Sequence, residues 1–132
     1  MTQPLKVLIV EDSEMDAELL VLRLTRSGYA PEWERVDTAA GFTQRLDPSL
    51  DIIFSDYRLP GFSGLEALRL LKASGLDVPF IIVSGSVEET DLAAVMRAGA
   101  ADVLLKDQLG RLGAAVAAAI AAALEHRRPP PA

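Results

Sequence analysis

Short continuous apolar runs alternate along the chain with longer segments whose apolar residues recur at helical spacing. Continuous hydrophobicity over a few residues is typical of strands that are covered on both faces. Four such strands are predicted, at residues 6–10, 52–55, 80–83 and 102–105. The segment 32–36 is more polar, so we predict a strand at the edge of the sheet, with Trp33 packed on it.

The segments between the strands are predicted helices, as in the spacing of Ala17, Leu20 and Leu24. Three of these segments carry a Ser-x-x-acid pattern that predicts an N-cap: Ser13 with Asp16, Ser63 with Glu66, and Ser86 with Glu89. Predicted helix ends fall at Gly28, Gly75 and Gly99. Strand and helix therefore alternate five times, which predicts a doubly wound α/β domain with a parallel sheet and helices on both faces.

The last predicted helix is rich in alanine and carries a stripe of larger apolar residues at near four-residue spacing. The stripe consists of Leu112, Val116, Ile120 and Leu124. We interpret it as core packing against the sheet. The alanines around it leave a smooth surface for a partner or a second copy, so homodimerisation stays open. Residues 114–124 are fewer than the roughly 20 needed to span a bilayer, and we expect no membrane association.

Composition narrows the classes of partner. The net charge is -6 and the basic residues are scattered, which argues against direct binding of nucleic acid. The chain has no cysteine, so a bound metal must use oxygen or nitrogen ligands. The single His126 is predicted to be solvated, which leaves oxygen. The N-terminus lacks the pattern of a signal peptide, and we expect a cytoplasmic protein.

The chain is predicted to form one domain over residues 1–126. Residues 127–132 are predicted to be a flexible tail or a truncated linker, because the prolines there cannot continue a helix.

Acidic residues follow two of the predicted strands, and a lysine follows a third. Glu11 and Asp12 come directly after residues 6–10, Asp56 after 52–55 and Lys106 after 102–105. Ligands of doubly wound domains bind at the carboxyl ends of the strands, so neighbouring first and third strands would bring three carboxylates together. Mutual repulsion favours a bound cation, and an all-oxygen, solvent-open cluster suits Mg²⁺. With Mg²⁺ and Lys106 to neutralise phosphoryl oxygens, Asp56 is a candidate nucleophile toward a phosphoryl group.

Four motifs at the strand ends resemble the signature of response-regulator receiver domains of two-component signalling, as in chemotaxis regulators. They are Val10-Glu11-Asp12-Ser13, the run SDYRLPGFSG at residues 55–64, Val83-Ser84-Gly85 and Leu105-Lys106. The resemblance spans residues 5–125. It implies a flavodoxin-like fold with five helices and the strand order 2-1-3-4-5.

The resemblance also assigns the phosphoryl chemistry. Asp56 would accept a phosphoryl group from a histidine kinase or a phosphotransfer protein. Glu11, Asp12, Asp56 and the backbone carbonyl of Arg58 would hold Mg²⁺. The protein would then be no enzyme in the usual sense, because it would catalyse only its own phosphorylation and dephosphorylation. The output would pass to an unknown protein or domain.

The same resemblance implies how the signal is read. Ser84 would be the switch hydroxyl that bonds a phosphoryl oxygen, and Lys106 would pair with another such oxygen. Pro60 and Gly64 would shape the loop and the start of the helix after the acceptor. A further hypothesis is that the side chains of Arg58 and Ser86 flank the path of the attacking water and tune the phosphoryl lifetime; the alternative is that both are solvated loop residues.

Two positions depart from the family pattern. Many receivers carry an aromatic residue three positions before the lysine, where this chain has Val103. The coupling between the switch hydroxyl and an aromatic side chain therefore cannot operate in the form that is usual in the family. Asp107 follows the lysine where proline is usual, often through a cis bond. Without proline a cis bond would cost roughly 3–4 kcal/mol, so a different loop geometry is expected.

Three other interpretations stay open. The acids can be simple helix N-caps. A degenerate receiver that binds partners without phosphorylation is favoured by Val103 and Asp107 and opposed by the complete set of acids, serine and lysine. A flavin-binding flavodoxin-like protein would need neutral groups around its phosphate, which the acidic run at residues 11–14 does not supply.

Overall fold

The computed structural model describes residues 2–86 and 88–127. Its elements, in chain order, are β1 (Gln3–Val10), α1 (Glu14–Arg26), β2 (Tyr29–Val36), α2 (Ala39–Arg45), β3 (Ile52–Ser55), β4 (Arg58–Leu59), β5 (Phe62–Ser63), α3 (Gly64–Ser74), β6 (Phe80–Ser84), α4 (Glu89–Ala98), β7 (Asp102–Leu105), the 3-10 helix η1 (Lys106–Arg111) and α5 (Leu112–Arg127). Every predicted strand is present. β1 and β2 begin earlier than predicted, and β6 ends one residue later.

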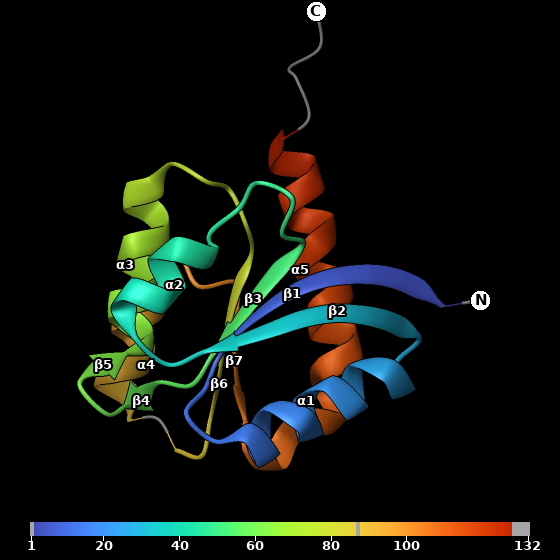
Figure 1. Ribbon diagram of the computed structural model, residues 1–132, viewed down its shortest axis with the longest axis horizontal. Coiled ribbons are helices and arrows are strands. Elements are labelled where there is room, and N and C mark those ends of the chain that lie inside the picture. The colour runs from blue at the N-terminus through green and yellow to red at the C-terminus, as the bar shows by residue number, and fades with distance from the viewer. Residues whose placement is uncertain (1, 87, 128–132) are drawn as a thin grey trace, which may run out of the picture.

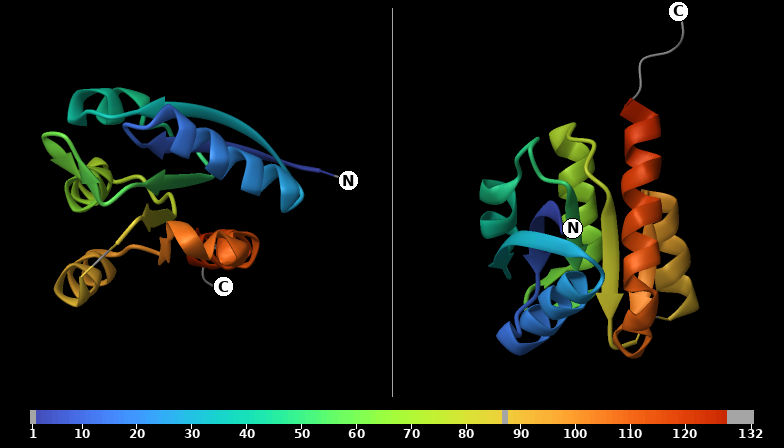
Figure 2. Two further views of the ribbon diagram at one scale, coloured as in Figure 1. Left: turned by 90° about the horizontal axis from the view of Figure 1, so that it is seen from below. Right: turned by 90° about the vertical axis from the view of Figure 1, so that its right-hand side faces the viewer.

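The five long strands form one parallel sheet in the order β2-β1-β3-β6-β7. Counted along this sheet alone, that order is 2-1-3-4-5, which confirms the predicted fold. Helices α1 and α5 cover one face of the sheet, and α2, α3 and α4 cover the other (Figures 1 and 2). The sequence analysis did not predict the small antiparallel pair of β4 and β5 that follows β3.

Alternate residues of the central strands enter two separate core layers. In β1, Val7 and Ile9 pack with the residues of α1 and α5, whereas Leu8 and Val10 pack with those of α2, α3 and α4. All four are buried almost completely. Burying such a side chain stabilises the fold by about 1.5–3 kcal/mol. The continuous apolar runs in the sequence therefore reflect strands that are covered on both sides.

Strand β2 lies at the edge of the sheet, as predicted, because β1 is its only neighbour in the sheet order. Much of β2 is exposed, and the side chain of Trp33 lies on it with 37% of the residue accessible to solvent. Pro31 has no N–H to donate to a neighbouring strand. It is tolerated in β2 because an edge strand pairs on one side only. The polarity of this segment follows from its position.

Two of the three predicted serine caps are present. The hydroxyl oxygens of Ser13 and Ser63 accept hydrogen bonds from the backbone three residues onward, at 3.2 and 3.1 Å. The prediction for Ser86 was wrong: α4 begins at Glu89, its N-cap is Glu88, and no side chain caps it. The predicted glycine stops are confirmed by positive φ angles at Gly28, Gly75 and Gly99.

Helix α5 packs on the sheet through the first part of its apolar stripe. Leu112 and Val116 are fully buried, but Leu124 is 62% exposed, so the predicted core stripe does not extend to the end of the helix. The segment Lys106–His126, in which η1 runs on into α5, is long and apolar enough to cross a membrane by length and composition, which corrects the argument from residues 114–124 alone. Because Leu112 and Val116 belong to a core cluster, we interpret α5 as a core helix of this domain.

The end of α5 makes one contact that the sequence did not indicate. The His126 side chain is largely exposed, as predicted, but its Nδ1 lies 2.7 Å from Oδ2 of Asp77. The helix extends through Arg127. The rest of the predicted tail, residues 128–132, lies outside the described residues.

Candidate functional site

Strand register brings the acidic residues to one rim of the sheet. β1 and β3 are parallel neighbours, with Val10 opposite Ser55. The residues that follow are therefore adjacent, and the backbone N–H of Asp56 donates to the carbonyl of Val10 at 2.9 Å. Glu11 is anchored on its other side, where its N–H donates to the carbonyl of Val36 at the end of β2. The predicted adjacency of the two strand ends is confirmed.

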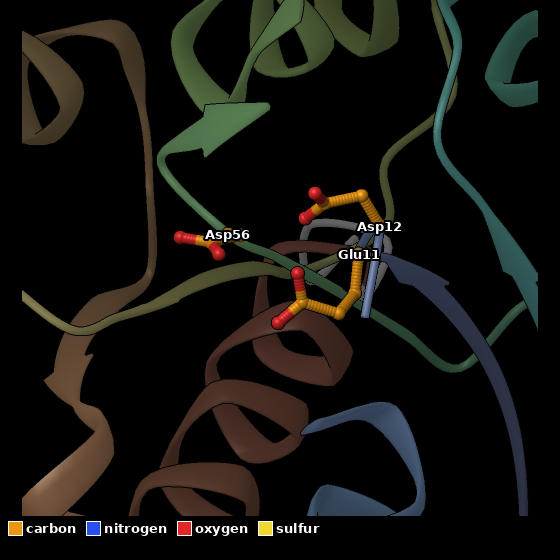
Figure 3. Close-up of side chains that lie close together, drawn as sticks. All are labelled: Glu11, Asp12 and Asp56. Carbon is orange, nitrogen blue, oxygen red and sulfur yellow. The ribbon is translucent and has the colours of Figure 1, made fainter. Parts of the chain in front are cut away.

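Glu11, Asp12 and Asp56 each offer a carboxylate oxygen, and these three oxygens lie within 4.8 Å of one another. Figure 3 shows the side chains of Glu11 and Asp12 at the end of β1 beside that of Asp56. Glu11 is buried, Asp56 is half-buried and Asp12 is exposed. The cluster is thus open to solvent on one side, which is the geometry expected of a site for a hard, partly hydrated cation.

The carboxylate of Glu11 is held in an unfavourable environment. Its Oε2 is buried and has no hydrogen-bond partner among the described residues. Burial, with a further contribution from the charge of Asp56, raises the pKa of Glu11 from its ordinary 4.5 to about 7, although the hydrogen bond from Lys106 opposes this. An oxygen of this kind is a natural ligand for a cation.

Lys106 lies at the start of η1, directly after β7, and reaches into the acidic cluster. Its Nζ donates to Oε1 of Glu11 and Oδ2 of Asp16, both at 2.7 Å, and to Oδ2 of Asp56 at 3.3 Å. Burial lowers the pKa of Lys106, but the hydrogen bonds with Asp16 and Glu11 and the charge of Asp56 outweigh it, so that the pKa lies above its ordinary range. The lysine is therefore a fixed cation beside Asp56.

Asp16 is a site residue that the sequence analysis missed. The sequence indicates Asp16 only as the acidic member of the Ser13 cap, and its backbone N–H does make that cap. Its side chain instead turns to Lys106, which is 90 positions away in the chain. The only signal in the sequence was an acid one helical turn after the strand-end pair.

The backbone after Asp56 is arranged so that its carboxylate is supported and the chain turns sharply. Oδ1 of Asp56 accepts from the N–H of Tyr57 at 2.7 Å, and the N–H of Gly64 donates to the carbonyl of Tyr57 at 2.8 Å. A Cβ on Gly64 would lie 2.7 Å from both the carbonyl oxygen of Asp56 and Cδ1 of Ile82. Only glycine fits there, in agreement with the role predicted for it.

The hairpin of β4 and β5 spans this loop, with Arg58 opposite Ser63. Pro60 and Gly61 form its turn, in which Gly61 has a φ of +68°. The exposed guanidinium of Arg58 points to α4, where it lies 3.9 Å from Oδ2 of Asp91. The predicted use of the Arg58 carbonyl as a metal ligand stays a prediction.

Ser84 ends β6 and is buried, with 4% of the residue exposed. Its hydroxyl donates to the carbonyl of Ser86 at 3.3 Å. Within residues 2–86 and 88–127, no hydrogen bond joins Ser84 to Asp56. The predicted switch hydroxyl is thus at the same end of the sheet but is turned to its own loop.

Arg35 is a second residue that the sequence analysis missed. It lies near the end of the edge strand β2, and its guanidinium donates to the backbone carbonyl of Glu11 at 3.1 Å. It also lies 3.4 Å from the carboxylate of Glu14 and 3.8 Å from that of Asp37. The guanidinium therefore fixes the segment that carries the acidic pair.

The structure shows the surroundings of Val103 and the backbone at Asp107, the two positions that depart from the family pattern. Val103 is half-buried and packs against the core layer formed with α2, α3 and α4. The peptide bond between Lys106 and Asp107 is trans, as are all peptide bonds in the described residues. The chain enters the 3-10 helix η1 at this point. The absence of a cis bond agrees with its expected cost without proline.

Comparison with known proteins places the chain in a family. Residues 7–117 match the response regulator receiver domain family, and the chain belongs to it. It is a receiver domain of the kind found in response regulators of two-component signalling. This membership leaves the flavin-binding interpretation without support.

Among curated proteins, the phosphate regulon transcriptional regulatory protein PhoB of Klebsiella pneumoniae is 34% identical over 104 residues. That match covers 76% of this chain and 44% of the relative, so the chain spans less than half the length of that protein. A solved receiver domain of a putative Luxo repressor protein from Vibrio parahaemolyticus superposes with a TM-score of 0.81 at 25% identity, covering 93% of this chain and 95% of that one. The structure of FixJ-N superposes with a TM-score of 0.76 at 27% identity, covering 98% and 100%.

Proposed function

We propose that the domain is a phosphoacceptor switch. Asp56 receives a phosphoryl group from a phosphohistidine of a histidine kinase or phosphotransfer protein, in a reaction that depends on Mg²⁺. The observation that carries this proposal is the convergence of Glu11, Asp12 and Asp56 on one space, with the Lys106 ammonium 3.3 Å from the Asp56 carboxylate. Simple N-caps would not bring acids and a lysine from different strands together.

The residues fit a magnesium ion. Glu11, Asp12 and Asp56 supply oxygen ligands only, and the unpartnered Oε2 of Glu11 is available to a cation. The backbone carbonyl of Arg58 would be a further ligand. When bound, Mg²⁺ supplies positive charge that stabilises the negative charge on the transferred phosphoryl group.

The chain's own groups account for the transfer. A carboxylate oxygen of Asp56 forms a bond to phosphorus while the bond from phosphorus to the donor imidazole breaks, and the imidazole nitrogen keeps the electron pair and takes up a proton. Lys106 donates to a phosphoryl oxygen. Hydrolysis ends the signal: water attacks phosphorus, the Asp56 carboxylate leaves, and inorganic phosphate is released. The domain then acts on no substrate other than itself.

Phosphorylation would shift the population of two conformations. In the phosphorylated state the Ser84 hydroxyl exchanges the Ser86 carbonyl for a phosphoryl oxygen. The surface formed by α4, β7 and α5 then changes its affinity for partners. Val103 replaces the usual aromatic residue of this surface, so the response travels through the loop after Ser84 without an aromatic rotation.

The output of the switch would be another protein or a domain outside these residues, since relatives such as PhoB are longer than this chain.

Homodimerisation through the alanine-rich face of α5 is a further proposal. We propose no direct contact with nucleic acid, because the net charge is -6. The cytoplasmic location stays an expectation.

Incubation with Mg²⁺ and acetyl phosphate, followed by intact mass spectrometry, tests the proposal. We expect the wild type to gain the mass of one phosphoryl group, and Asp56→Asn to gain none. Omission of Mg²⁺ is expected to abolish the gain. If the wild type gains no mass under any of these conditions, the phosphorylation-independent interaction module becomes the better account.

A further inference from the structure

Lys106 has three carboxylate partners, but only two of them belong to the metal cluster. Glu11 and Asp56 are both in that cluster and both accept from the ammonium. Asp16, the third partner, lies in the first turn of α1 and is outside the cluster. It nevertheless makes one of the two shortest contacts with Nζ, at 2.7 Å.

Binding of a divalent cation would change these three contacts unequally. Oxygens of Glu11 and Asp56 that coordinate a cation lose much of their attraction for a neighbouring ammonium, because the cation offsets their charge. Asp16 does not coordinate it and keeps its full charge. Asp16 is then the strongest remaining partner of the lysine.

Asp16 is well placed to act as a fixed anchor. Its backbone N–H is bonded to the Ser13 cap, and the next residue, Ala17, is buried in the core. Asp16 and Lys106 line a cavity of about 80 Å³ whose other lining includes Leu20 and Leu109. Apolar neighbours strengthen a charged hydrogen bond by excluding water.

We propose that Asp16 is a positioning residue, which keeps the Lys106 ammonium beside Asp56 when the metal cluster is occupied. This inference rests on the proposed function and adds a residue to it. Both the negative charge and the acceptor oxygen of Asp16 hold the ammonium. A carboxamide at this position still offers such an oxygen, whereas a methyl group does not.

Three variants separate this role from other effects. Asp16→Asn keeps an acceptor and removes the charge, and Asp16→Ala removes both. The control is Glu18→Ala, which removes a charge from an exposed position of the same helix, where the side chain makes no hydrogen bond within the described part of the chain. The Ser13 cap uses the backbone of Asp16, so all three variants retain it.

The measurement is the rate of phosphorylation by acetyl phosphate at saturating Mg²⁺, together with the Mg²⁺ concentration at half-maximal rate. We expect Asp16→Ala to lose about tenfold in rate, the factor that corresponds to roughly 1.4 kcal/mol. Asp16→Asn is expected to lose less than Asp16→Ala, because it keeps an acceptor oxygen but not the charge, and Glu18→Ala is expected to match the wild type. The Mg²⁺ midpoint is expected to change little in all of them.

The outcomes that overturn the inference are distinct from failure of the proposed function. If wild type is phosphorylated but Asp16→Ala is equally fast, the lysine needs no anchor. If Asp16→Asn and Asp16→Ala are both faster than wild type, Asp16 acts as an electrostatic brake. If Asp16→Ala reaches the wild-type rate at saturating Mg²⁺ and only its Mg²⁺ midpoint is shifted, Asp16 acts through the metal instead. A wild type that is not phosphorylated rejects the proposed function itself.

Discussion

The Nζ of Lys106 lies 3.3 Å from Oδ2 of Asp56, although the two residues are 50 positions apart in the sequence. The same ammonium donates to Oε1 of Glu11 at 2.7 Å. The Lys106 ammonium therefore bonds to carboxylates that would also coordinate a metal ion. In the metal-free protein it neutralises part of the charge of the acidic cluster.

This relationship predicts that Lys106→Met binds Mg²⁺ more tightly than the wild type. Removal of the competing cation leaves the carboxylates of Glu11 and Asp56 free and makes the local potential more negative. We expect a gain of about tenfold in affinity, which corresponds to roughly 1.4 kcal/mol. Calorimetric titration with Mg²⁺ measures it, with Lys72→Met, at the far end of α3, as the control. Equal or weaker binding by Lys106→Met would contradict the account.

The raised pKa of Glu11 predicts a pH dependence of Mg²⁺ binding. In the metal-free protein the pKa of Glu11 is about 7 instead of 4.5. The charged form is disfavoured in the fold, so the contribution of Glu11 to stability is greatest below pH 4.5 and is lost as the pH rises through about 7. Mg²⁺ needs the ionised carboxylate, and its affinity should therefore rise with pH up to about 7 and level off above.

The control for this pH dependence is Glu11→Gln, which cannot ionise. We expect weak binding of Mg²⁺ to this variant and no rise in affinity across the same pH interval. Titrations of both proteins at pH values on each side of 7 decide the matter. An affinity of the wild type that is constant across this interval would show that Glu11 is already ionised below it.

Gly64→Ala is predicted to destabilise the domain. The new Cβ would lie 2.7 Å from the Asp56 carbonyl oxygen, which is backbone and cannot rotate away. Overpacking of this kind costs about 1–3 kcal/mol in the free energy of unfolding. Urea denaturation measures it. Gly110→Ala is the matched control, since a Cβ there meets nothing within 4 Å. Similar unfolding free energies for both variants would refute the steric argument.

Ser84→Ala is predicted to separate phosphorylation from the response to it. The Ser84 hydroxyl bonds the Ser86 carbonyl in the unmodified protein, and in the proposed switch it moves to the phosphoryl group. We expect beryllofluoride, a phosphoryl analogue, to shift the amide NMR signals of Gly85 and Ser86 in the wild type. In Ser84→Ala those shifts should be much smaller while the signal of Tyr57, beside Asp56, still moves. Equal shifts at Gly85 in both proteins would exclude the hydroxyl as the switch.

The parts of the fold that local sequence determines were predictable. The central strands are fully buried, so their apolar runs identified them, and β3 and β7 have the predicted bounds. The start of β1 was missed because Gln3 and Pro4 are exposed, and the start of β2 because Tyr29 is the only fully buried residue among its first three. The hairpin of β4 and β5 was missed because two-residue strands leave no periodic pattern. The Ser86 cap was wrong because α4 starts too late for it.

The site likewise contains residues that the local sequence identified and residues that depend on tertiary packing. Glu11, Asp12, Asp56 and Lys106 follow directly from strand ends, and strand order then fixes where they meet. The contact of Asp16 with Lys106 depends on how α1 packs beside η1, and no local pattern encodes that. For the same reason, the bond from Arg35 to the Glu11 carbonyl required the pairing of β1 and β2.

The central claim is that Asp56 itself carries the phosphoryl group. An acyl phosphate is reduced by borohydride to the alcohol, so that a phosphorylated aspartate becomes homoserine. The decisive measurement is peptide mass spectrometry after treatment with Mg²⁺, acetyl phosphate and borohydride. The account predicts homoserine at position 56 and its absence when Mg²⁺ is withheld. Homoserine at another aspartate, with position 56 unchanged, would contradict it.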